Sequence, residues 1–233
     1  MDSFLIENES FRTFGRQHFL VLGILILLSI VIPRLAKRWS YSKQVTSLRI
    51  TAVLISGTVI IWTIIKLGIG GFNYKTDLPI DICNLLALSL PFVFWKPSLQ
   101  RFELFVYWVF LGTFVALLTP HLVNGFPNYT FFKYWIVHGG LVLFFVYLSV
   151  VFEYVPSRKS IFRSFLGLQV YFIFAVFINL ALGSNYVYLL GKPPTVSPLD
   201  WFGPWPFYIL IVDLIGLIIF VLIWKAFQWT KKE

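Results

Sequence analysis

Seven apolar runs, separated by short polar connections, extend along the whole chain. A helix of about 20 mainly apolar residues spans the hydrocarbon core of a bilayer. The pattern therefore predicts an all-α fold, a polytopic bundle of about seven transmembrane helices that forms one integral membrane domain over residues 1–233. The third run is short and crowded by Pro79, Pro91 and Pro97. The predicted spans are 18–33, 48–68, 79–95, 102–120, 131–152, 163–183 and 205–228.

The composition supports a membrane protein. Hydrophobic residues make up 58% of the chain and charged residues only 12%, whereas a soluble domain carries about 25% charged residues. The formal net charge is +9, but the basic residues lie in short connections between apolar runs. Their distribution therefore indicates membrane topology and contact with anionic headgroups, and no nucleic-acid partner is expected.

The basic residues also predict the orientation. Thirteen Lys and Arg residues fall on the side that contains the first, third and fifth connections and the C-terminus, and six fall on the other side. The positive-inside rule then places the N-terminus outside and the C-terminus in the cytoplasm. The chain starts with acidic residues and its first run lacks a small-residue cleavage site, so a retained first helix is expected.

Nearly all the unusual polar residues within the spans are predicted to lie toward the outer face. Polar side chains in a membrane are costly and usually face a partner or a wet cavity. Because different spans contribute to one depth, we expect a polar cavity open to the outer leaflet or the outside water. The residues are Lys66, Asp81, Cys83, Asn84, His138, Asn179, Asn185 and Asp213.

Cys83 and His138 are the one nucleophile–base pair available in this set. An imidazole that accepts the thiol proton activates a cysteine, and a helix N-terminus stabilises the thiolate. Cys83 lies in the first turns of the third span and His138 about two turns into the fifth. The alternatives are an inert buried cysteine and a histidine that hydrogen-bonds another helix.

Two asparagines are candidates for orienting a substrate. At about 100° per residue, Asn84 lies closer in angle to Cys83 than Asp81 does. Asn84 or Asn179 is therefore the expected hydrogen-bond donor to a developing oxyanion.

The charged residues near this site have several candidate partners. Asp81 and Lys66, together with Asn185 at the end of the sixth span, are expected to bind substrate or to pair charges. Asp81 has three candidate partners, which are Lys66, Lys75 and His121.

Asp213 and the two other histidines have less specific interpretations. Asp213 either orients His138, holds a cation or pairs with Lys66. His18 and His121 are expected to be interfacial and solvated.

Other features favour structural interpretations. Trp62 and most other tryptophans fall near span ends, which is typical of the interfacial aromatic belt rather than of an aromatic ligand cage. Gly139 and Gly140 predict close helix packing. The chain has one cysteine, no His-x-x-x-His pair and no Gly-rich phosphate loop, so no metal and no cofactor are expected.

Three motifs carry a resemblance to a known family. LPIDICNLLAL, YWIVHGGLVLFF, and NYVYLLGKPP followed by GPWPFY occur in the same order in the YwaF-type bacterial integral membrane proteins, which this chain resembles over nearly its whole length. That family is similar to a eukaryotic multi-span family described as an acyltransferase acting on ether phospholipids. The resemblance implies Cys83 and His138 as the catalytic pair and a bacterial inner (plasma) membrane location. Asp81 departs from it, because the bacterial motif has histidine there.

These observations favour a membrane phospholipid acyltransferase or acyl hydrolase that forms an acyl-thioester on Cys83. Its partner would be a phospholipid or lysophospholipid. The alternative is a small-solute or proton-coupled transporter or binding protein that uses the same cavity, and a third interpretation is a structural protein without catalysis. A cavity that continues to the cytoplasmic side would favour transport.

Overall fold

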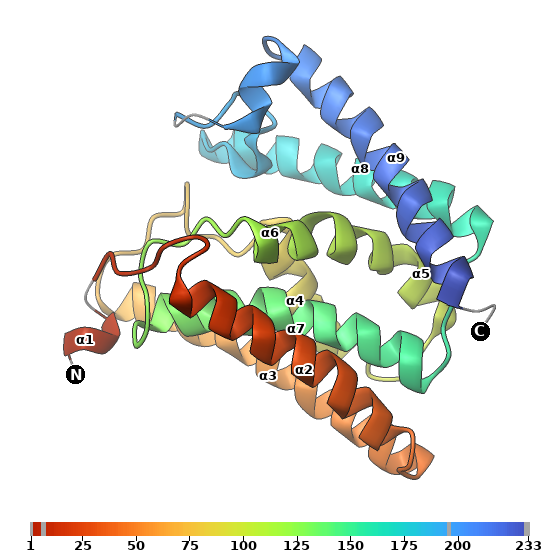
Figure 1. The fold of residues 1–233 in the computed structure, drawn as a ribbon. Coiled ribbons are helices and arrows are strands. Elements are labelled where there is room, and N and C mark those ends of the chain that lie inside the picture. The colour runs from red at the N-terminus through yellow and green to blue at the C-terminus, as the bar shows by residue number, and fades with distance from the viewer. Residues whose placement is uncertain (1, 6–7, 195–196, 231–233) are drawn as a thin grey trace.

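The computed structural model describes residues 2–5, 8–194 and 197–230 of the chain. Over these ranges the secondary structure is entirely helical (Figure 1). The predicted all-α polytopic bundle is therefore confirmed. The helices are α1 (Asp2–Leu5), α2 (Arg16–Ala36), α3 (Tyr41–Gly68), α4 (Ile82–Val93), α5 (Leu99–Trp108), the π-helix η1 (Val109–Thr113), α6 (Phe114–Leu118), α7 (Tyr129–Val151), α8 (Arg158–Leu182), the short 3-10 helices η2 (Tyr186–Tyr188) and η3 (Pro198–Phe202), and α9 (Phe207–Thr230).

Six of these segments are long and apolar enough to cross a membrane. They are α2, α3, the continuous segment Leu99–Leu118, α7, α8 and α9. The third predicted span, 79–95, corresponds to α4, which has only 12 residues and is about 18 Å long at 1.5 Å per residue. This is less than the roughly 30 Å of a hydrocarbon core, so α4 is a partial crossing.

The helices run back and forth along one direction, and the two chain ends lie at opposite ends of the molecule (Figure 1). We call the end where α2, α4 and α7 begin and α3 ends the N-terminal end of the bundle. The loop-charge prediction assigns this end to the outside.

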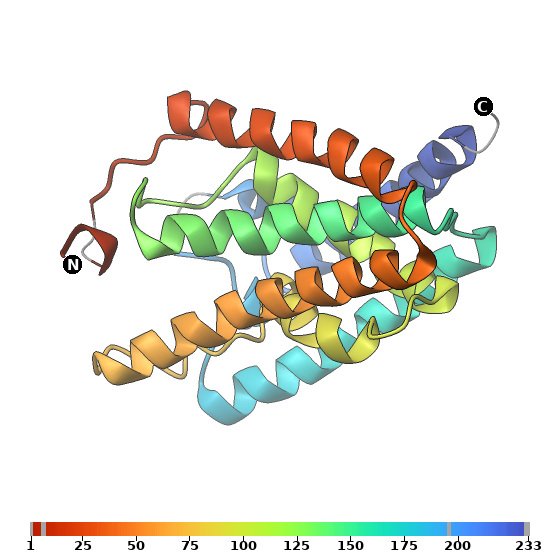
Figure 2. The same cartoon turned by 90° about the horizontal axis from the view of Figure 1, so that it is seen from below.

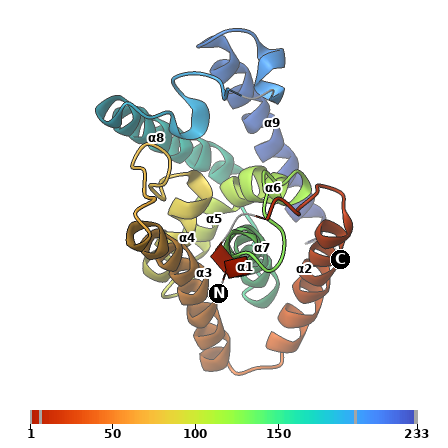
Figure 3. The same cartoon turned by 90° about the vertical axis from the view of Figure 1, so that its left-hand side faces the viewer.

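Helix α7 is the centre of the bundle. It lies between α2 and α3 and also packs against α4, α6 and η1 (Figures 2 and 3). Helices α8 and α9 form a second layer, which contacts the rest through α5 and η1. The chain elements that meet at the N-terminal end of α7 are therefore α3, α4 and the connection from α6.

The glycine pair of α7 permits the close approach that the sequence predicted. A Cβ atom added to Gly139 would lie 2.6 Å from Leu25 of α2, and one added to Gly140 would lie 2.9 Å from Ile55 of α3. Both distances are shorter than side-chain carbons tolerate, so each glycine admits a neighbouring helix.

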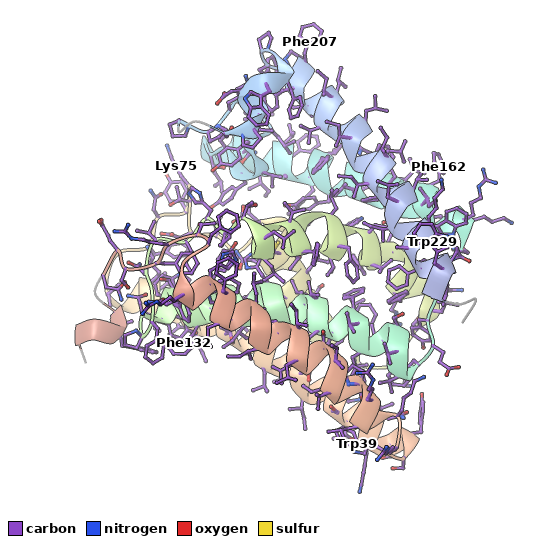
Figure 4. All side chains as sticks on the ribbon, viewed as in Figure 1. Trp39, Lys75, Phe132, Phe162, Phe207 and Trp229 are labelled. Carbon is purple, nitrogen blue, oxygen red and sulfur yellow. The ribbon has the colours of Figure 1, made fainter. Side chains whose placement is uncertain are left out.

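The outer surface of the bundle is strongly apolar. Phe162, Phe207 and Trp229 project from its flanks (Figure 4) and are 64%, 60% and 73% exposed. A soluble monomer rarely exposes contiguous apolar surface on this scale. Together with the helix lengths, this surface identifies a protein solvated by lipid.

His18 corrects one sequence prediction. It was expected to be solvated, but it is 0% exposed. The chain before α2 covers it, and the Phe14 N–H donates a 2.9 Å hydrogen bond to Nδ1. Nε2 lies 2.8 Å from the Leu117 carbonyl, to which it donates. His18 is therefore a structural residue that ties the N-terminal segment to the end of α6.

Candidate functional site

A cavity of about 370 Å³ lies at the N-terminal end of the bundle, beside the start of α7. Trp62 of α3 forms part of its wall. The residues Asp81, Cys83 and Asn84 at the start of α4 form another part. His121, in the connection between α6 and α7, lies at its exposed rim. Figure 3 views the molecule from this end. The cavity thus collects residues that are far apart in the sequence.

One face of α7 completes the wall. Its members follow the spacing i, i+3, i+4, i+7 and i+8, which places them on a single helix face. They are Thr130, Lys133, Tyr134, Val137 and His138. Of this face only His138 was predicted as a site residue, although Lys133 and Tyr134 precede it on the same helix face.

Cys83 is the second residue of α4, and its side chain is half-buried. The first-turn N–H groups of a helix carry partial positive charge, which favours a thiolate at this position. Its Sγ atom lies 3.6 Å from Oγ1 of Thr113. Thr113 is 0% exposed and is the last residue of the π-helix η1. Single-turn π-helices occur frequently at functional sites, and here one presents a hydroxyl group to the thiol.

His138 is held by its own helix. Its Nδ1 atom lies 2.8 Å from the backbone carbonyl of Tyr134, and a carbonyl can only accept a hydrogen bond. The proton of the neutral ring is therefore on Nδ1, which leaves Nε2 as a base. The Tyr134 ring stacks on the imidazole at 4.1 Å between centroids, and its hydroxyl donates to the Ala116 carbonyl. No hydrogen bond between Nε2 and another described residue is present.

Cys83 and His138 line the same cavity without a direct hydrogen bond between them in the described part of the chain. Asn84 also faces the cavity, is half-buried and has no hydrogen bond to a described residue. A thiol, an imidazole nitrogen and an amide thus meet in one chamber. This combination can support nucleophilic attack, proton transfer and stabilisation of an oxyanion.

The charged residues of the cavity differ from the predicted pairs. Lys66 forms its ion pair with Asp77 at 3.5 Å, not with Asp81. Asp81 precedes α4, and partial removal from bulk water raises the pKa of its carboxyl group, an effect that the positive charge of Lys133 opposes. Asp77 and Lys133 were not predicted from the sequence, because their roles depend on how α3 and α7 approach each other.

Asn179 and Asn185 lie elsewhere. Asn179 is 0% exposed, donates to the Tyr186 carbonyl at 3.0 Å and accepts from Ser184 Oγ at 2.9 Å. Asn185 donates to the Gly191 carbonyl at 2.8 Å. Through these hydrogen bonds, both side chains stabilise the segment after α8. The oxyanion role expected of Asn179 is therefore corrected to a structural one. Asn185, which was expected to bind substrate or to pair charges, is not among the described residues that line the cavity, and that role stays a prediction.

Asp213 is also separate from the cavity. It accepts a 2.9 Å hydrogen bond from Gln169 of α8 and lines a small cavity of about 120 Å³. Its predicted partners, His138 and Lys66, are therefore replaced by a neighbour in the second layer. The predicted depth of Asp213 did not specify which side of α9 it occupies.

The fold and this cavity define a multi-pass helical membrane protein with a polar chamber at one end of its bundle. A sequence model of the TMEM164 family matches residues 13–224, which include every residue named around the chamber. The chain belongs to the TMEM164 family. It is also 24% identical over 195 residues to a protein of Treponema pallidum (strain Nichols) described as an uncharacterized protein, covering 81% of this chain and 79% of that one. No solved structure matches the chain.

Proposed function

We propose that this protein is a membrane-embedded phospholipid acyltransferase or acyl hydrolase. Cys83 is its nucleophile and His138 its general base. The observation that carries the proposal is that both side chains line one cavity, with the Nε2 atom of His138 free to accept a proton.

The reaction is a double displacement. His138 Nε2 takes the thiol proton as Cys83 Sγ attacks the ester carbonyl of a phospholipid. The tetrahedral intermediate collapses, the lysophospholipid oxygen leaves with the proton from His138, and the acyl group remains on sulfur as a thioester. A lysophospholipid hydroxyl group or water then attacks the thioester while His138 accepts its proton. That proton passes to the released sulfur and restores the thiol.

Neighbouring groups assist this sequence. The Thr113 hydroxyl group, 3.6 Å from Sγ, donates to the thiolate. The Asn84 amide faces the cavity and donates to the oxyanion of the intermediate. Both groups act on charge that develops during reaction, which is where hydrogen bonds accelerate a step most effectively.

The position of the cavity favours a lipid ester as the substrate. His138 is nine residues after Tyr129, the start of α7, or about 13 Å along the helix. A bilayer with its headgroups is about 40–45 Å thick. With Tyr129 at the headgroup surface, the cavity would extend from the headgroups past the middle of one leaflet, a range of depths that includes the glycerol esters and the first acyl carbons.

The alternative, a small-solute or proton-coupled transporter, is less well supported. The helix turns below the cavity are packed, since Leu86, Ala87 and Leu141 are 3%, 0% and 0% exposed. These residues belong to the main apolar core. A transporter needs a continuation of the cavity toward the other face, and the burial of these three residues argues against one directly below it.

The test uses the purified full-length protein in nanodiscs, with a phospholipid that carries a radiolabelled acyl chain and a lysophospholipid acceptor. We expect label on the protein that hydroxylamine releases, as a thioester requires. Cys83→Ala should abolish it, and His138→Gln should slow turnover by about 10²–10⁴-fold. Lys75→Gln, which alters an exposed lysine at the same end of the bundle that does not line the cavity, is the control and should change turnover little. Full turnover by Cys83→Ala would refute the proposal.

A further inference from the structure

Lys133 is a cation without an ion-pair partner at the cavity wall. No carboxylate of the described residues lies within 4 Å of its ammonium group, whereas Lys66 nearby is paired with Asp77. The Lys133 side chain is only partly exposed. Asp81 acts on this ammonium group only at longer range. A partly desolvated ammonium group with no carboxylate in direct contact is energetically costly, so this position favours direct binding of an anion.

Trp62 places a second cation next to it. The Nζ atoms of Lys133 and Lys66 lie 5.9 Å and 5.7 Å from the centroid of the Trp62 ring. The indole is itself stacked on Tyr129, with centroids 5.5 Å apart and planes 9° from parallel. Tyr129 is anchored by a 2.9 Å hydrogen bond to the Thr58 carbonyl. Two ammonium groups are thus arranged around one fixed aromatic ring.

We propose that Lys133, supported by Lys66 across Trp62, binds the phosphate group of a glycerophospholipid. Lysine binds phosphate as a compact point charge. This inference rests on the proposed function for the identity of the reacting ester. It makes Lys133 a specificity-determining residue that selects phosphate-bearing lipids over neutral glycerides.

The spacing along α7 suits this role. Lys133 precedes His138 by five residues, which is about 7.5 Å along the helix axis. In a glycerophospholipid only a short glycerol linker separates the phosphate from the nearer acyl ester. A phosphate held at Lys133 therefore directs the ester deeper into the cavity, toward Cys83 and His138.

Binding, rather than turnover, tests the inference. The probes are a dialkyl ether analogue of phosphatidylcholine, the corresponding dialkyl ether glycerol, and inorganic phosphate. Neither ether lipid has an ester, so neither can react. Native mass spectrometry of the full-length protein reports the bound fraction of each lipid, and inorganic phosphate is titrated as a competitor.

Lys133→Gln should weaken binding of the ether phospholipid by at least about tenfold and leave ether glycerol binding unchanged. Lys133→Arg, which keeps the charge, should retain binding within a few-fold. Lys75→Gln removes an exposed lysine from the same end of the bundle and is the matched control. The thermal unfolding midpoint of each variant verifies that it is folded.

Equal binding of the phospholipid by wild type and Lys133→Gln would overturn the inference. Inorganic phosphate that binds as tightly as the lipid would also overturn it, because the site would then belong to the free anion. Lys133-dependent binding without acyl-enzyme formation would overturn only the proposed function. Lys133-independent binding of the phospholipid together with Cys83-dependent acyl-enzyme formation would overturn only this inference.

Discussion

The Thr113→Val substitution tests the polarity of the Cys83 environment directly. Valine has nearly the shape of threonine, and Thr113 is 0% exposed, so the change removes one hydroxyl group without opening a cavity. The only side-chain partner of that hydroxyl group in the described residues is Cys83 Sγ at 3.6 Å. The valine methyl group that replaces the hydroxyl group cannot donate a hydrogen bond to the sulfur.

The expected magnitude follows from the charge on sulfur. A hydrogen bond to a charged group contributes about 1.5–3 kcal/mol, whereas one between neutral groups contributes about 1 kcal/mol. The variant therefore destabilises the thiolate more than the thiol. The difference is about 0.5–2 kcal/mol, and at about 1.4 kcal/mol per factor of ten the reactivity of the cysteine should fall by about 2- to 30-fold.

The assay uses the fact that Cys83 is the only cysteine of the chain. Alkylation of the purified protein by excess iodoacetamide at a fixed pH gives a rate constant that belongs to this residue. Thr113→Ser should retain most of the rate. Thr58→Val is the matched control, because the Thr58 hydroxyl group donates to the Leu54 carbonyl within α3. An alkylation rate constant of Thr113→Val equal to that of wild type would show that the hydroxyl group does not stabilise the thiolate.

Three further predictions concern stability. Gly140→Ala should destabilise the protein by about 1–3 kcal/mol, because the new methyl group meets Ile55, which is 2% exposed and cannot move aside; unchanged denaturant unfolding in detergent would contradict this packing. Arg163→Met should cost about 1.5–3 kcal/mol, since it removes the 2.7 Å ion pair to buried Glu103, and the same unfolding assay measures it. Asp81→Asn should raise the melting temperature at neutral pH but not at low pH. The raised pKa of Asp81 means that its contribution to stability is present at low pH and is lost as the pH rises through that pKa; an equal effect at both pH values would be evidence against it.

The sequence predicted the helices well because the bilayer imposes their length. Six spans lie where long apolar runs occur. Helix α4 is shorter than the predicted span 79–95, because Lys96 and Pro97 follow closely after its end. Thr113 could not be predicted as a neighbour of Cys83. Its direction depends on the π-helix η1, and a local change of helical register leaves no mark in the apolar pattern.

For the site residues, the sequence predicted the distance from the membrane face but not the direction in which each side chain points around the bundle. Cys83, Asn84 and His138 line one cavity, whereas Asp213 and Asn179, at a similar predicted depth, belong to the second layer. Hydropathy gives the distance of a residue from a membrane face and leaves its angle around the bundle undefined. The angle follows from which helices pack together, and that information lies in contacts such as the one between Gly140 and Ile55.

The packing of Leu86, Ala87 and Leu141 beneath the cavity closes it toward the middle of the bundle. Under the proposed mechanism, a lysophospholipid that has given up its acyl group would therefore leave toward the membrane face from which the phospholipid entered. The donor phospholipid and the acceptor would then compete for one binding site and occupy it alternately. Such an enzyme would exchange acyl chains among the lipids of one leaflet and would not move lipids to the other leaflet.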